Sequence, residues 1–214
     1  RTLPSQITLK DISPFVPVLS HFKEPITLDM QVKGTVDQLT CSHLEITADD
    51  RQFRLSGDVS LQELSNPQDA YVYGKLSELS ANSRGVSFLV RNLSSNYNGV
   101  PPLLERLGDI DFRGEISGYF TDLVTYGQLR TGLGNVKTDL KLSSDKTKGL
   151  FAYSGAVKTE EFGLGKLLNN DKLGEITFNL DVHGRHIEKQ LPAVELKGLI
   201  ASVEYSSCLL YTSP

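Results

Sequence analysis

Few residues in this chain have the types and spacing that chemistry at a site requires. His183 and His186 stand three residues apart, but in a strand such residues point to opposite faces, which argues against a shared metal ion. Asp109 and Asp111 share one strand face and could contact a cation, although a solvated outer face explains them better. These four residues therefore favour a polar surface over a metal centre.

Other short motifs also have structural explanations. Glu160-Glu161 and Asp49-Asp50 are typical of turns. Gly132-x-Gly134 and Gly163-x-Gly165 lack the spacing and the strand-to-helix context of a phosphate loop. Asn92-Leu93-Ser94 is a formal glycosylation sequon, which has little meaning if the source is bacterial. Because no nucleophilic triad stands out either, we expect a protein that is not an enzyme and that needs no cofactor or metal.

The composition of the chain excludes further classes of function. The chain has 214 residues, a formal net charge of −4 and no run of basic residues, so we expect no nucleic-acid partner. No run of about 18 apolar residues is present that could span a bilayer as a helix. Cys41 and Cys208 lie far apart and form neither a metal-ligand spacing nor a disulfide framework.

The two ends suggest that the chain is a piece of a longer protein. It begins with Arg1 and stops in the middle of a strand pattern. The last residues, 208–214, read CLLYTSP, break the preceding pattern and resemble translated sequencing-adapter sequence. We therefore interpret 208–214 as a non-native tail and leave it out of the predicted fold.

An internal repeat is the strongest feature of the sequence. Residues 107–118 read LGDIDFRGEISG and residues 173–184 read LGEITFNLDVHG, so that five residues (Leu, Gly, Ile, Phe and the final Gly) recur in register 66 positions apart. A fainter copy begins at Ile26, and each copy follows a short apolar segment, at 14–22, 101–108 and 164–174. The repeat predicts stacked units at 1–100, 101–163 and 164–207, the first with a leading short helix near 14–22.

Period-two alternation of apolar and polar residues dominates the repeats and predicts half-buried strands. Three short helical segments, at 13–22, 101–107 and 162–169, cannot cover such a sheet. Glycines recur inside the strand patterns, where they favour bends. We therefore predict an all-β fold, an elongated repeat of antiparallel amphipathic strands curled into a groove, with a few short helices.

The predicted groove has an apolar wall. Its residues are those that alternation places on one face of the strands, namely Ile26, Leu28, Met30, Val32, Phe53, Leu55, Val59, Ile110, Phe112, Ile116, Val136, Leu140, Ile176, Phe178, Leu180, Val182, Leu196 and Ile200. An acyl chain gains about 0.8 kcal/mol per buried methylene, so such a wall could hold lipid tails. The alternative is that these side chains pack against one another as a dry core.

The strand repeats resemble a known family. The stretch at 112–144, which contains LRTGLGNVKTDLKL, and the following YSGAVKTEEFGLGKLL at 153–168 are similar to the middle region of TamB/AsmA-like envelope proteins of the Bacteroidota type. The likeness covers nearly all of residues 5–207 through loose, compositional motifs. It implies a long, taco-shaped β-sheet with an apolar concave face and no catalytic residues.

The resemblance also implies a cellular location and a set of partners. Members of that family are anchored in the inner membrane by an N-terminal helix, cross the periplasm and serve as conduits for phospholipids toward the outer membrane. Some were first described as assembly factors for outer-membrane proteins. The expected partners are thus phospholipid acyl chains, the inner membrane through an anchor outside this chain, and an outer-membrane barrel protein.

Two other functions stay open at this stage. One is a structural or adhesive cell-surface β-repeat protein with a closed core that binds through its polar face. Against it, we expect the outer face to lack the exposed Trp and Tyr platforms of glycan-binding surfaces. The other is a scaffold that holds unfolded outer-membrane strands at an open sheet edge.

Overall fold

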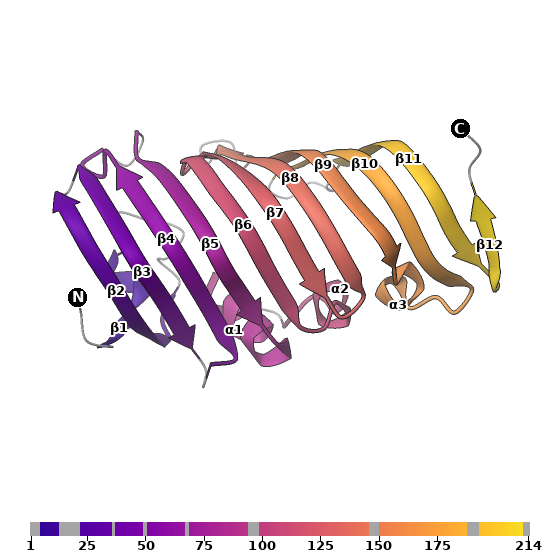
Figure 1. The fold of residues 1–214 in the computed structure, drawn as a ribbon, viewed down its shortest axis with the longest axis horizontal. Coiled ribbons are helices and arrows are strands. Elements are labelled where there is room, and N and C mark those ends of the chain that lie inside the picture. The colour runs from indigo at the N-terminus through magenta and orange to yellow at the C-terminus, as the bar shows by residue number, and fades with distance from the viewer. Residues whose placement is uncertain are drawn as a thin grey trace.

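The fold is one open antiparallel sheet. The computed structural model describes residues 5–12, 22–35, 37–48, 51–66, 69–93, 99–145, 150–187 and 193–211. In these ranges twelve strands lie side by side in sequence order without closing (Figure 1). The strands are β1 (Ser5–Thr8), β2 (Pro25–Thr35), β3 (Gln38–Ala48), β4 (Phe53–Gln62), β5 (Tyr71–Ala81), β6 (Ile110–Tyr119), β7 (Asp122–Thr131), β8 (Gly134–Asp145), β9 (Leu150–Phe162), β10 (Leu173–Ile187), β11 (Ala193–Tyr205) and β12 (Cys208–Tyr211). The predicted all-β curled sheet is confirmed.

Short helices lie along one long edge of this sheet (Figure 1). They are α1 (Ser83–Leu93), α2 (Pro102–Arg106) and α3 (Leu164–Leu168), and a 3-10 turn, η1 (Leu9–Ile12), follows β1. Helices α2 and α3 confirm the two predicted helical segments after residue 100, and Pro102 begins α2 because its missing N–H is not needed there. Residues 13–21 of the segment predicted near 14–22 lie outside the described residues.

Helix α1 is absent from the prediction, although it is the longest of the three. Its sequence carries β-branched residues and an internal Gly85, which favour strand or loop. The start is fixed by Asn82, whose side-chain oxygen accepts hydrogen bonds from the backbone N–H of Arg84 and of Gly85, both at 3.1 Å. Val86 and Phe88 of α1 are buried against the rest of the protein, so tertiary packing overrides the weak helix propensity of this segment.

The sequence repeat corresponds to a helix and four strands. Its three copies form β2, β6 and β10. Strand pairing places Leu28, Phe112 and Phe178, one from each copy, in the same row across the sheet. Equivalent residues therefore face the same side of the sheet at intervals of four strands.

Glycines permit the curl. Gly34, Gly118, Gly155 and Gly198 lie inside strands with φ between +120° and +142°, a conformation that other residues rarely adopt. A side chain at Gly118 would collide with the carbonyl oxygen of Asp122 on the neighbouring strand. At these positions the missing side chain permits the close approach of the neighbouring backbone.

Two segments differ from the prediction. Glu160 and Glu161 lie near the end of β9 and do not form a turn, because the strand continues through Glu161, whose φ is +50°, to Phe162. Cys208–Tyr211, excluded from the predicted fold with the rest of 208–214, forms β12 and pairs with β11. The sheet therefore continues into the segment that the sequence pattern excluded.

Candidate functional site

One row of side chains crosses almost the whole sheet. It takes one residue from each strand from β2 to β11, each directly opposite the next, and we call it the apolar track: Leu28, Ile46, Leu55, Leu79, Phe112, Leu129, Val136, Thr159, Phe178 and Ile200. Ten strands at about 4.8 Å spacing make the track about 43 Å long. An apolar strip therefore runs perpendicular to the strands.

Thr159 is the one polar member of the track, and its polarity is hidden. The side chain is buried, and its hydroxyl donates a hydrogen bond to the backbone oxygen of Asn135 at 2.6 Å. With the hydroxyl satisfied by the backbone, this position presents no free polar group to the groove. The apolar surface thus continues without a break from β8 to β10.

The eighteen predicted wall residues lie on one face of the sheet, but their exposure differs. Four are buried: Ile26, Leu28, Phe53 and Ile176. Three are exposed, namely Val32, Leu196 and Ile200, and the remaining eleven are of intermediate exposure. A dry core would bury most of them, so much of this face remains in contact with solvent.

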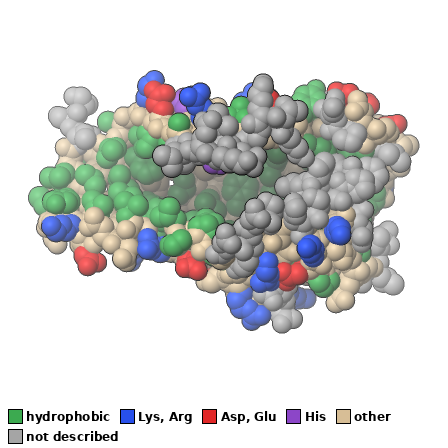
Figure 2. All heavy atoms as spheres, turned by 180° about the vertical axis from the view of Figure 1, so that it is seen from behind, with side chains coloured by type: hydrophobic (Ala, Val, Ile, Leu, Met, Phe, Trp, Pro, Cys, Tyr) green, Lys and Arg blue, Asp and Glu red, His purple; other side chains and the backbone are tan. Residues whose placement is uncertain are grey.

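The exposure divides the face into two halves. Of the fifteen buried hydrophobic residues among the described part of the chain, thirteen precede residue 93 and only Phe162 and Ile176 follow it. From the rear, Figure 2 shows hydrophobic side chains gathered along a hollowed face. The half formed by β2–β5 is thus a closed core, and we call the half-exposed face of β6–β11 the open groove.

An aromatic ring lies flat on the floor of the open groove. Ring atom Cζ of Phe112 lies 2.9 Å from where a Cβ would stand on Gly114 and 2.6 Å from the equivalent point on Gly127. Tyr153 covers Gly184 in the same way. The rings take the space of the missing side chains, so these glycines keep the floor low and apolar.

The wall prediction missed several strands. Ile46, Leu79 and Leu129 belong to the apolar track but were not among the predicted residues. In β3 and β5 a register shift beside Leu44 and Leu76 breaks the alternation that the prediction used. Pairing each predicted strand with its neighbour would have found these positions, because the track needs one residue from every strand.

The opposite face carries aromatic residues that the prediction did not expect. Tyr73, Tyr119 and Tyr126 are exposed on the outer face of β5, β6 and β7, the last at 67%. Tyr119 also contacts Tyr71 edge-on, with ring centroids 5.4 Å apart. The expectation of an outer face without exposed tyrosines is wrong, because these residues occupy the polar parity of their strands.

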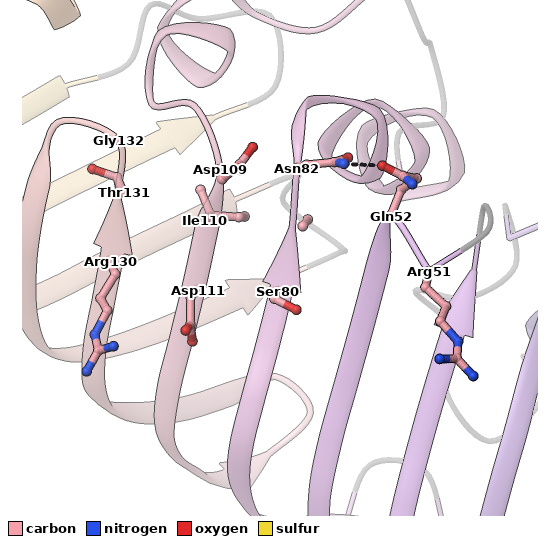
Figure 3. A pocket seen from close by; sticks show the side chains of 11 residues that line it. Arg51, Gln52, Ser80, Asn82, Asp109, Ile110, Asp111, Arg130, Thr131 and Gly132 are labelled. Carbon is pink, nitrogen blue, oxygen red and sulfur yellow. Dashed lines mark hydrogen bonds between the residues drawn. The ribbon is translucent and has the colours of Figure 1, made fainter.

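A cavity of about 490 Å³ lies at the edge of the sheet that carries the helices, where β4 and β6 begin and β5 and β7 end. Arg51 and Arg130 lie on opposite sides of it, with Asp109 and Asp111 between them (Figure 3). The two carboxylates point in different directions, and Asp111 pairs with Arg113 of its own strand at 3.3 Å. The side chains do not converge on a common point, as a catalytic or metal site requires.

The remaining candidates are placed as follows. His183 pairs in register with Ser154 and His186 with Phe151, so the two histidines face opposite sides of the sheet, as expected. No cluster of three or more metal-ligating side chains occurs within the described ranges.

Asn92 of the sequon is buried, and both the oxygen and the nitrogen of its side-chain amide are hydrogen-bonded, so it is inaccessible to modification in the folded chain. Asp49 and Asp50 lie outside the described residues.

Comparison with known proteins identifies no relative: no family model, no curated protein and no solved structure matches this chain. Among the helices that the structure describes, none has the length and apolar character needed to cross a membrane.

Proposed function

We propose that the open groove binds the acyl chains of phospholipids. The observation that carries this proposal is the apolar track, which continues across β6–β11 through residues that remain half-exposed. Exposed apolar surface of this extent is unfavourable in water and marks a binding site in soluble domains. A lipid tail is the ligand that matches a long strip without polar contacts.

The energetics agree with such a ligand. Each methylene moved from water into the groove contributes about 0.8 kcal/mol, so binding strength would grow with chain length. Around Phe112 and Phe178 the track offers aliphatic and aromatic side chains, and the hydroxyl of Thr159 between them is bonded to the backbone. A tail could therefore shift along the track without breaking any directional bond, which suits a conduit better than a storage site.

The proposal extends to the setting that the resemblance implies. As a TamB/AsmA-like segment, the chain would work in the periplasm of a protein anchored in the inner membrane. It would conduct phospholipids between the two membranes, or assist the assembly of outer-membrane barrel proteins. The open sheet and its apolar concave face support this reading, and the chemistry of the groove is non-enzymatic.

Native mass spectrometry with lipid extraction tests the proposal. We expect phospholipid to co-purify with the chain and to be lost in Phe112→Asp and Phe178→Asp, because each change places a carboxylate in the open groove. Tyr126→Asp is the matched control: it introduces the same charge on the opposite face, at a side chain that is already 67% exposed. The control is expected to keep its lipid.

The results separate binding from folding. Circular dichroism should show strand content like that of the parent chain in all three variants, since Phe112 and Phe178 are only half-buried. Retention of lipid by both groove variants, or a folded parent chain that carries no phospholipid after exposure to vesicles, would contradict the proposal.

A second function has specific support. The closed core of β2–β5 and the exposed Tyr73, Tyr119 and Tyr126 fit a structural or adhesive cell-surface protein that binds through its outer face. In that case Tyr126→Asp would abolish binding to cell-wall or surface glycans, and the two groove substitutions would not. Glycan-array binding of the same three variants distinguishes this function from lipid binding.

A further inference from the structure

Helix α1 lies on the same face of the sheet as the apolar track. Phe88 of α1 is 1% exposed and contacts Phe22 edge-on, with ring centroids 5.3 Å apart, and Phe53 of β4 at 6.0 Å. The cluster around Phe88 also includes the track residues of β3, β4 and β5, namely Ile46, Leu55 and Leu79. The cluster that α1 forms with Phe22 thus covers the track where it crosses these three strands, and α1 itself lies against β4 and β5.

The cover ends between β5 and β6. Leu79, the track residue of β5, packs against the cluster around Phe88, whereas Phe112, its direct partner on β6, does not. On β6 the cluster reaches only Ile110, the first residue of the strand. Among the described residues, no such cluster covers the track from Phe112 to Ile200, and of its members there only Thr159 is buried. Along the track, the boundary between the closed core and the open groove therefore falls between Leu79 and Phe112.

The C-terminal end of α1 is fixed to the start of β2. Asn92 is 2% exposed, accepts hydrogen bonds from the backbone N–H of Lys23 at 3.1 Å and of Glu24 at 3.2 Å, and donates to Glu24 Oε1 at 2.9 Å. Arg91 donates two further hydrogen bonds to both oxygens of Glu24, at 2.5 and 2.8 Å. A helix held this way is a fixed part of the fold and not a loosely docked segment.

We infer that α1 is the end wall of the lipid site on this row: acyl chains occupy the track from β6 to β11 and cannot pass along it beneath α1. Lipid that moves further along the sheet must leave the track for the rows toward the other ends of the strands, where Val32 and Val59 remain accessible. The inference rests on the proposed function. Five strand spacings from Phe112 to Ile200 give about 24 Å of track. A tail fills about 15 Å, half of the ~30 Å hydrocarbon core of a bilayer, so the open groove holds one phospholipid along its length and not two in file.

Thiol protection in the whole chain tests where the lipid lies. Single cysteines are introduced as Leu129→Cys and Phe178→Cys in the open groove and as Leu55→Cys beneath α1, each with Cys208→Ser to remove the exposed native thiol. Alkylation by a small maleimide is timed with and without dioleoylphosphatidylcholine vesicles. We expect lipid to slow alkylation several-fold at the two groove positions and to leave the rate at Leu55→Cys unchanged.

The possible outcomes are distinct. Protection at the groove positions alone supports both the groove and its end wall, and native mass spectrometry should then show one bound phospholipid. Protection at all three positions, or two lipids per chain, leaves the proposed function intact and overturns the end wall. Protection at no position overturns the lipid site itself, and the end wall with it.

A variant of α1 adds an independent measurement. Gly85 lies so close to the β3–β4 connection that a Cβ would collide with the carbonyl oxygen of Gln52, so Gly85→Ala moves α1 away from the sheet. We expect lipid protection to extend to Leu55→Cys in this background and not in the matched Ser87→Ala background, whose side chain bonds only within α1. Unchanged protection in a folded Gly85→Ala chain contradicts the end wall, and the alkylation pattern of the parent chain decides the question if that variant does not fold.

Discussion

Replacement of Asn92 by alanine should remove the main polar attachment of α1. The amide of Asn92 makes four hydrogen bonds: it accepts from the backbone N–H of Lys23 and of Glu24, and it donates to the carbonyl oxygen of Phe88 at 2.9 Å and to Glu24 Oε1. Alanine satisfies none of these groups. Because the amide is buried, water cannot fully replace it.

The cost follows from this geometry. A buried hydrogen bond contributes about 0.5–1.5 kcal/mol, and the groups around Lys23 and Glu24 are partly accessible to water, so four bonds correspond to about 2–4 kcal/mol in the free energy of unfolding. Arg91→Ala is the comparison. Its ion pair with Glu24 has side chains 44% and 38% exposed, and removal of such a pair costs about 0.5–1 kcal/mol.

Urea denaturation followed by circular dichroism measures both variants. We expect the midpoint of Asn92→Ala to fall clearly below that of Arg91→Ala, with the loss concentrated in the transition of the closed core. Equal midpoints, or a cost below about 1 kcal/mol for Asn92→Ala, would refute the reasoning, because the buried amide would then matter no more than the exposed ion pair.

Two further predictions concern a glycine and a carboxylate. Gly118→Ala should cost about 2 kcal/mol or more, because its φ of +130° and the carbonyl oxygen of Asp122 leave no room for a Cβ. Gly74→Ala, whose Cβ would stand 3.6 Å from the nearest side-chain atom, should change the urea midpoint by less than about 1 kcal/mol. Hydrogen bonds from Arg91 lower the pKa of Glu24 below its ordinary value of 4.5, so the stabilisation is present above about pH 4.5 and is lost as the pH falls through the lowered pKa. Acid titration of the urea midpoint should therefore fall less steeply in Arg91→Ala than in the parent chain, and equal slopes would contradict this.

Alternation and the repeat were sufficient to predict the fold class and the face of every wall residue. Their power comes from the period of two in a strand, which leaves a side chain only two directions. The same rule failed for Ile46 and Leu79, because register shifts in β3 and β5 displace the pattern. It also assigned Tyr126 to the polar face without showing that its ring would be exposed there.

The sequence did not reveal which part of the apolar face is covered by a helix. Helix α1 has a strand-like composition, and its start depends on a single capping side chain, Asn82. Its contacts join residues such as Phe22 and Phe88, which lie far apart in the chain. Whether an apolar face is a core or a groove depends on such contacts, so periodicity alone left both readings open.

The repeat shows how the same sequence unit can form part of a closed core in one copy and of an open groove in another. Leu28 of β2 and Phe112 of β6 are equivalent positions on the apolar track, yet the first is buried and the second is half-exposed. Both strands alternate in the same way around these positions, although β2 pairs with β3 through a register shift after Asp29 and β6 pairs with β7 without one. The link between β5 and β6 carries both α1 and α2, whereas the link between β9 and β10 carries the five residues of α3. The additional helix α1 forms, together with Phe22, the cluster that covers Ile46, Leu55 and Leu79. From β6 to β11 the described residues leave most of the track half-exposed.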